Sequence, residues 1–244
     1  MALNVNAVYQ TVLMILNKEQ RGYMTPTEFN KVATQVQLEI FEKYFDDLNQ
    51  QLRVPQADTD YADRQESIDE KIAIFKTFGN AVYDNTTLPL SPFFTLPLID
   101  TYGDTVDFYR LGNVLYNDEK VVERLDRHEF YYANQSKLTK PSKINPAYLY
   151  ENQKLFIKPT SVVDSIKVDY VRKPKDVVWG FIVGNLGQYK FQPGATTVDF
   201  EIHVSEQTEV ILKILLYSGI IIRDPQIIQT AAALVQAEET NKKS

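Results

Sequence analysis

Four polar residues lie close together in the segment VVERLDRHEF: Glu123, Asp126, His128 and Glu129. Carboxylates and an imidazole can supply a general acid, a general base or metal ligands, so this is the most enzyme-like cluster in the chain. Glycoside hydrolysis needs two carboxylates held across a cleft, normally by separate elements, and no partner for Glu129 can be named. We therefore expect the cluster to be the polar edge of a strand or turn.

Other patterns that support catalysis or ligand binding are missing from the sequence. His128 and His203 stand in neither H-x-H nor H-x-x-x-H order, so a metal site would have to rest on carboxylates. There is no cysteine, and neither nucleotide-binding glycine motif occurs. Gly180, Gly184 and Gly187 precede no helix start, which favours a loop tip between strands. We expect no catalytic residue, no metal and no cofactor, and hence no enzyme.

A basic cluster with aromatic neighbours follows the acidic one. Its members are Arg127, Lys137, Lys140 and Lys143, with Tyr131 and Tyr132 beside them. Cationic side chains next to stacking rings can hold a nucleic-acid backbone, and the same charges can hold an acidic protein. A solvated surface explains the cluster without any partner, and we favour that interpretation.

The net charge of the chain argues against sequence-specific DNA binding. The 26 basic and 32 acidic residues leave a formal charge of -6, which repels phosphates over most of the surface. A mildly acidic wall would suit a conduit through which DNA slides without sticking. The same charge also gives plain solubility, which we favour as the simpler explanation.

Length and composition are those of an ordinary globular protein. The chain has 244 residues, 44% of them hydrophobic, enough for one elongated domain or two small ones; we favour one compound unit. No basic region precedes the first apolar residues, so we expect no secretory signal. The most apolar stretch, 210–222, is shorter than the roughly 20 residues that span a membrane, and we expect no membrane association. The lack of cysteine leaves the redox compartment open.

Helical periodicity marks the N-terminal part of the chain. Apolar residues at spacings of three and four predict a helix over 5–17. Thr25-Pro26-Thr27-Glu28 is a capping box, which predicts the start of a second helix that runs to about Arg53. A third helix is expected on the acidic stretch that follows, where Ile68, Ile72 and Phe75 share one face.

The middle of the chain has the pattern of β structure. After Gly79, prolines exclude a long helix, and short strands are expected at 106–111, 154–158, 166–172 and 198–204. Apolar and polar residues alternate in the last two, so each has one buried face. The turn signal Gln192-Pro193-Gly194 predicts that 189–191 pairs with 198–204 across a hairpin.

Helical periodicity returns at Ser205. Glu206 and Glu209 suit the positive end of a helix that is apolar almost all round and that Gly219 can break. Asp224-Pro225 predicts the start of a last helix.

The order of these elements predicts an α+β fold. We expect an N-terminal helical segment over 1–80, a β-rich module over 81–204 and a C-terminal helical segment over 205–244. The helices of the two ends would pack together as one bundle, with an antiparallel sheet or small barrel inserted between them.

Three motifs are distinctive in combination: the helix start in RGYMTPTEF, the strand end VDYVRKP and the helix pair in LLYSGIIIRDP. With the segments around them and with LDRHEFYYANQSKLTKPSKINPAYLY, they resemble virion proteins of tailed phages that infect Bacteroidetes, most closely the crAss-like phages. The resemblance extends over most of the chain. It implies a neck or ring component of the head-to-tail adaptor class, with flanking helices around a β module.

That resemblance implies a mechanical role. The chain would form a cyclic homo-oligomer, of about twelve copies by analogy with portals, beneath the portal and around the DNA channel. Its partners would be the portal protein, other neck and tail ring proteins, and packaged DNA that passes without sequence-specific binding. The protein would be assembled in the host cytoplasm and located in the neck or tail of the virion.

Two sets of residues are expected to make subunit or partner contacts. The helix 206–217 is too apolar for a lone surface helix, so we expect it to supply bundle core or subunit contact. The residues concerned are Val210, Leu212, Leu215, Leu216 and Tyr217. Arg172, Lys173 and Pro174 end a strand and would contact the next layer of the neck.

Two other functions stay open on the sequence alone. A tail component could bind or act on host surface glycan through tyrosines and carboxylates, and Glu129 would then be essential. A packaging accessory protein could contact DNA through the basic cluster over 127–143.

Overall fold

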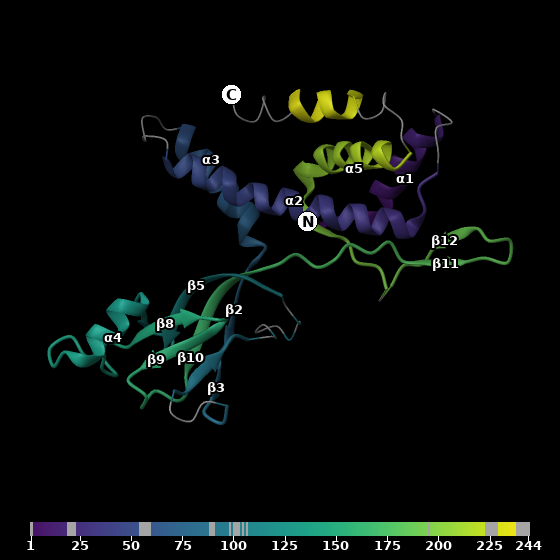
Figure 1. Cartoon of the computed structure of the whole chain (residues 1–244). Coiled ribbons are helices and arrows are strands. Elements are labelled where there is room, and N and C mark those ends of the chain that lie inside the picture. Colours follow the sequence, from purple (N-terminus) through teal and green to yellow (C-terminus); the bar gives the residue numbers. More distant parts are fainter. Residues whose placement is uncertain are drawn as a thin grey trace. The chain divides into compact units, whose positions relative to one another are not determined.

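The computed structural model describes residues 2–18, 23–53, 60–87, 91–97, 99, 103, 105, 107–194, 196–222 and 229–237. These residues form a mixed α+β structure with two compact units (Figure 1). Unit 1 is built from Met1–Ile74 and Pro174–Ser244, and unit 2 is Phe75–Lys173. The α+β class expected from the sequence is confirmed.

Unit 1 holds helices from both ends of the chain. They are α1 (Val5–Lys18), α2 (Pro26–Arg53), α3 (Asp60–Ala73) and α5 (Gln207–Ile222), which the 3-10 turn η1 (Val204–Glu206) precedes. Residues 229–237 are also helical. α5 contacts α1 and α2, and α2 contacts α3 (Figure 1). The N- and C-terminal helical segments therefore pack on each other.

The start of α2 follows from its capping box. The Thr25 backbone N–H donates to Glu28 Oε2 at 2.9 Å, and the Glu28 N–H donates to Thr25 Oγ1 at 3.3 Å. The Thr25 hydroxyl also donates to Glu28 Oε2, at 2.7 Å, and this bond, with the one from the Thr25 N–H, holds the pKa of Glu28 below its ordinary value by stabilising the ionised carboxylate. The predicted bounds of this helix are confirmed.

α5 differs from the prediction in one respect. It continues through Gly219, which was expected to end it. Glycine costs about 1 kcal/mol in a helix interior, and the burial of this turn offsets that cost, since Ser218 and Gly219 are both buried. The second predicted helix start, at Asp224-Pro225, lies outside the described residues.

Two small antiparallel ribbons belong to unit 1. β1 (Ala2–Leu3) pairs with β13 (Phe200–His203), and β11 (Phe181–Val183) pairs with β12 (Tyr189–Phe191). The prediction that 189–191 pairs with 198–204 is wrong. Gly187 takes a left-handed φ of 77° and the Gly184 N–H donates to the Gln188 oxygen at 2.8 Å, so the tight turn forms on the other side of β12. The predicted loop tip is confirmed at Gly184 and Gly187, whereas Gly180 is buried directly before β11.

Unit 2 contains nine strands and one helix among its described residues. They are β2 (Lys76–Asn80), β3 (Val82–Asp84), β4 (Phe93–Thr95), β5 (Phe108–Tyr116), β6 (Lys120–Val121), β7 (Glu123–Arg124), α4 (Arg127–Gln135), β8 (Ala147–Glu151), β9 (Lys154–Lys158) and β10 (Ile166–Arg172). One sheet has the order β2-β10-β5-β6 and the other β3-β4-β9-β8-β7. The pairs are antiparallel except for β7 with β8.

The two sheets of unit 2 are linked at both edges by the chain itself. β2 leads into β3, and β6 into β7, with one residue between in each case. The core lies between the sheets and includes Val114, Val168 and Tyr170 from one, and Phe94 and Leu155 from the other. Among the described residues, hydrogen bonding forms two open sheets, not the closed small barrel that was one of the two expected forms.

The division of the chain differs from the expected boundary of the β-rich module. The structure assigns β11, β12 and β13 to unit 1, although they fall within the expected module 81–204. The reason is a row of polar side chains on α2: Asn30 and Thr34 hydrogen-bond to the backbone of Trp179 and Val177. Gln37 continues the row, as described below. The segment after unit 2 is thereby attached to α2.

Candidate assembly surfaces

The contact residues predicted on α5 have two different environments. Val210 and Leu215 are buried, whereas Leu212, Leu216 and Tyr217 are half-buried. Because α5 contacts α1 and α2, Val210 and Leu215 belong to the core of unit 1. Surface that a second subunit could reach remains at the other three.

A network of buried charges surrounds the start of α5. Glu206 and Glu209 are each 2% exposed. Glu206 Oε1 lies 2.7 Å from Lys71 Nζ on α3, and Glu209 Oε1 lies 3.0 Å from Lys43 Nζ on α2. Lys213 Nζ lies 3.7 Å from Glu209 Oε1. A carboxylate is tolerated at such depth only when it is paired, so the network requires this placement of α5 on α2 and α3.

Two tyrosines extend this network. The Tyr217 hydroxyl donates to Glu39 Oε1, and this bond raises the pKa of Tyr217 to about 12. Lys213 Nζ also approaches Glu39 Oε2, at 3.7 Å. Burial raises the pKa of Tyr44, and the charges of Glu206 and Glu209 raise it further.

Sequence reasoning missed this network. It assigned the two glutamates to the positive end of the helix dipole, which needs no partner from another helix. The sequence does contain a signal for this network: two carboxylates lie at the start of a helix that is apolar almost all round. Such a helix must be packed against other elements on several sides, and those elements must supply cations that pair with its two carboxylates.

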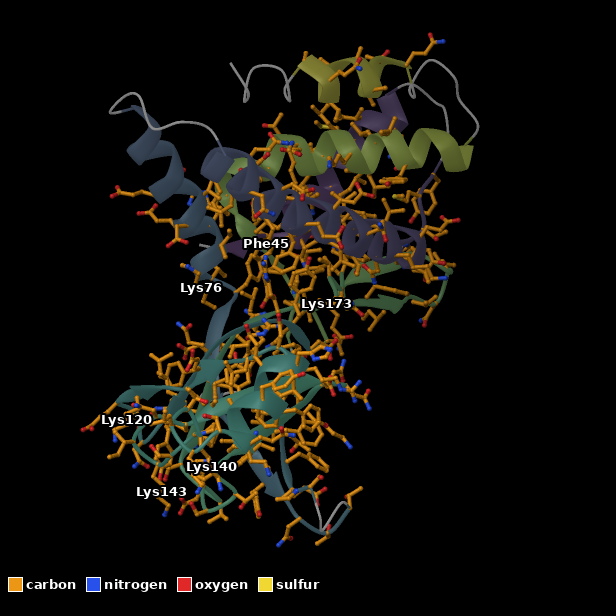
Figure 2. All side chains as sticks on the ribbon, turned by 60° about the vertical axis from the view of Figure 1, so that its left-hand side comes forward. Phe45, Lys76, Lys120, Lys140, Lys143 and Lys173 are labelled. Carbon is orange, nitrogen blue, oxygen red and sulfur yellow. The ribbon has the colours of Figure 1, made fainter. Side chains whose placement is uncertain are left out.

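The predicted layer contact at Arg172, Lys173 and Pro174 lies where β10 leaves unit 2. Arg172 and Lys173 are half-buried and Pro174 is buried. The Arg172 N–H donates to the Phe75 oxygen at 2.9 Å, and the Lys173 N–H donates to the Asp107 oxygen at 2.7 Å. Their backbone thus closes unit 2 at this end, and Figure 2 labels Lys173 there.

The enzyme-like cluster is divided between a strand and a helix. Glu123 lies in β7, and Asp126 is the N-cap of α4, whose third residue is Glu129. The Asp126 N–H donates to Glu129 Oε2 at 3.4 Å, while the ring of His128 stacks on Tyr132. The polar-edge interpretation therefore missed a helix. In the described part of the chain, no group of three histidine, cysteine or acidic side chains could hold a metal ion.

The basic cluster lies on α4 and on the loop that follows it, where Figure 2 labels Lys140 and Lys143. Its lysines and its two tyrosines are exposed. Leu138, at 97% exposure, is the most exposed large apolar side chain of this loop. No acidic residue occurs between Glu129 and Glu151. The three lysines and two tyrosines therefore lie within an acid-free stretch, residues 130–150, whereas Arg127 Nε lies 3.3 Å from Glu151 Oε1.

A second exposed apolar surface lies on β11, β12 and the turn between them, which we call the hairpin arm (181–191). Leu186 is 92% exposed and Val183 62% exposed, and Ile182 is also exposed. No other described strand pairs with the arm. Sequence reasoning expected this tip but not its apolar exposure, which the Ile182-Val183 pair and Leu186 could have indicated.

Comparisons with known proteins add no assignment: no family model and no curated protein sequence matches this chain. Among the described helices, none is long and apolar enough to cross a lipid bilayer.

Proposed function

We propose that this chain is a structural subunit of a phage virion, a head-to-tail adaptor. In this role it forms a cyclic oligomer beneath the portal and around the DNA channel. The terminal helices form the bundle of each subunit, and unit 2 is the β module inserted into it. The function is assembly, and no chemical step is assigned to it.

One observation carries this proposal: both ends of the chain build unit 1, and unit 2 is inserted between them. The resemblance to ring proteins of crAss-like phages implies the same order of flanking helices and central β module. The buried ion pairs of α5 support it further, because they hold the C-terminal helix on helices from the N-terminal segment.

The charge of the two units is compatible with a channel protein. Unit 1 contains 20 acidic and 13 basic residues, whereas unit 2 contains 12 acidic and 13 basic residues. A channel wall contributed by unit 1 would repel the DNA backbone and let it slide. In such a ring, neighbouring subunits must touch through other surfaces than their acidic ones, because acidic surfaces repel each other.

Native mass spectrometry with and without the portal protein of the same phage tests the proposal. We expect a closed homo-oligomer of about twelve copies, formed alone or on the portal. A chain that stays monomeric in both samples contradicts it.

A second function, DNA contact by a packaging accessory protein, is favoured by the exposed lysines of residues 130–150, a stretch without acidic side chains. Lys137, Lys140 and Lys143 are exposed there beside Tyr131 and Tyr132. Retention on DNA-cellulose should then fall as salt rises, and replacement of the three lysines by glutamine should abolish it. Replacement of Lys76, Lys120 and Lys154 by glutamine is the control of equal charge. No retention at low ionic strength excludes this function.

A further inference from the structure

The hairpin arm is an unusual element for the surface of an isolated subunit. A two-stranded ribbon is marginal in water unless something packs on it, and both of its outer edges offer unpaired backbone groups. In Figure 1 its tip extends beyond the helices of its own unit. Its exposed side chains include the strongly exposed apolar Leu186 and Val183, beside the polar Asn185 and Gln188 and the single charge of Lys190.

The base of the arm, in contrast, is firmly held. Trp179 lies two residues before Phe181, the start of β11, and its ring stacks on Phe181 and Phe191 with centroids 6.1 and 5.6 Å away. Its indole Nε1–H donates to Asn6 Oδ1 at 3.0 Å, and its backbone N–H donates to Asn30 Oδ1 at 2.8 Å. The arm is therefore a fixed projection whose direction is set by α1 and α2.

The composition of the arm is that of an interface core. Between residues 177 and 198 the sole charged residue is Lys190, although 24% of the chain is charged. Interface cores are depleted of charge and enriched in aromatic and apolar side chains. Exposed apolar groups gathered on one projecting element indicate a binding surface.

Unit 1 has a second charge-free surface, on α1. No charged side chain occurs between residues 2 and 17. Met14, at 55% exposure, lies on the side of the helix opposite the buried row of Val8 and Val12, and Ile15 is exposed at the edge of that row. The rest of unit 1 is strongly acidic, so two copies repel each other over most of their surfaces. Contact between the arm of one copy and α1 of another sets no acidic group against another acidic group.

We propose that the hairpin arm packs against the outer face of α1 in a second copy of this chain. The inference rests on the proposed ring, and it deepens it by naming the subunit contact. The two surfaces are different, so the contact is heterologous, and a heterologous contact is the kind that closes a ring.

Disulfide crosslinking tests the contact directly, because the chain has no cysteine of its own. Leu186→Cys and Met14→Cys variants of the full chain, one lengthened by a tag, are mixed under assembling conditions and oxidised. The mixed product should exceed that of a control pair, Leu138→Cys with Met14→Cys, by about tenfold or more, because only cysteines within disulfide reach crosslink efficiently. Equal yields from the two pairs overturn the proposal.

A charge placed in the contact gives a second, independent test. Leu186→Asp should raise the concentration at which half of the chains are assembled by about tenfold or more, because it sets an acid against the neighbouring copy. Leu138→Asp, at a side chain of matched exposure in unit 2, should leave that concentration unchanged. Unchanged fluorescence of Trp179, the sole tryptophan, shows that the base of the arm is intact.

The outcomes separate this inference from the proposed function. If Leu186→Asp assembles like the original chain, the arm is not the contact, and the ring stands. If Leu186→Asp keeps its homo-oligomer but loses the portal, the arm binds the portal and the inference is overturned. If the original chain never assembles, the ring and the arm contact fall together.

Discussion

Single side chains hold the C-terminal helix of unit 1 in place. Glu206 and Glu209 pair with Lys71 and Lys43, which come from two different helices. Each ion pair is satisfied in one position of α5, because a shift of one turn would leave a buried carboxylate without its cation. For a subunit whose proposed role is geometric, this fixed placement matters more than the net stability that the pairs contribute.

Neutralising Glu209 should destabilise the subunit. Glu209→Gln leaves Lys43 and Lys213 without their buried carboxylate, and we expect the free energy of unfolding to fall by about 1–3 kcal/mol. Urea denaturation followed by circular dichroism measures it. Glu66→Gln, an exposed carboxylate on α3, should change the value by less than about 0.5 kcal/mol. Equal effects of the two variants would show that the buried pair is unimportant.

Tyr217 gives the subunit a defined dependence on alkaline pH. Its pKa of about 12 lies above the ordinary value of 10.0, so its contribution to stability is complete below pH 10 and is lost as pH rises through 12. Tyr217→Phe should therefore be less stable than the original chain at pH 8, and the difference should shrink between pH 10 and 12. The urea midpoints of the two proteins, compared at pH 10 and at pH 12, measure this difference in stability. A difference that does not change with pH contradicts the assigned hydrogen bond to Glu39.

At the scale of elements, α2 is the support on which unit 1 is assembled. Asn30, Thr34 and Gln37 lie on one face of the helix and hydrogen-bond to the extended chain that follows unit 2. Gln37 Nε2 donates to the Lys175 oxygen at 2.7 Å, and Gln37 Oε1 accepts from the Glu201 N–H at 2.9 Å. The polar side chains of a helix thus take the place of a neighbouring strand.

Removing the amide of Gln37 should be costly for this reason. Gln37→Ala removes a buried side chain and leaves two part-buried backbone groups without these partners, so we expect a loss of about 1–3 kcal/mol in unfolding free energy. Thermal or urea denaturation measures it. Gln50→Ala, at an exposed position of the same helix, is the matched control, with an expected change within about 0.5 kcal/mol. A Gln37→Ala variant as stable as the control would contradict the role of this row.

Local patterns predicted those elements whose signals are local. The capping box at Thr25 and the alternation in 166–172 gave the bounds of α2 and β10, because caps and period-two burial act within a few residues. α4 was missed since its nine residues carry one buried side chain, Phe130, and therefore no apolar row. The pairing partner of β12 was predicted wrongly because a turn signal lies on each side of this strand. Only the glycine turn before β12 forms a hairpin, which pairs it with β11.

The candidate surfaces were less predictable than the elements. Lys71 and Lys43, the nearest partners of Glu206 and Glu209, stand more than 130 positions away in sequence, so no local pattern could name them. The exposure of Leu186 depends on what covers the hairpin arm, which is a property of the folded unit. Val210 was expected at a contact because apolar residues suit both cores and interfaces, and the structure places it in the core.

At the scale of the whole molecule, unit 2 has a hydrophobic core of its own. Its two ends are adjacent, since the Arg172 N–H donates to the Phe75 oxygen, and the core between its sheets is drawn from both. An inserted domain whose ends meet can fold alone. The insertion thus adds a module without interrupting the packing of unit 1.

A fragment of residues 75–173 should therefore fold by itself. We expect a cooperative urea transition and dispersed amide resonances, because the buried residues of the core come from within the fragment. Val168→Asp, which places a charge in that core, should abolish the transition. A fragment that is unfolded without this change would mean that the unit depends on the rest of the chain.

The central claim is that copies of this chain form a ring on the portal. Negative-stain electron microscopy of the full chain mixed with the portal protein tests it most directly. The account predicts a closed ring, coaxial with the portal and with an open channel, that is lost in Leu186→Asp and retained in Leu138→Asp. Portal particles that carry no added layer, with the original chain left as monomers, would contradict it.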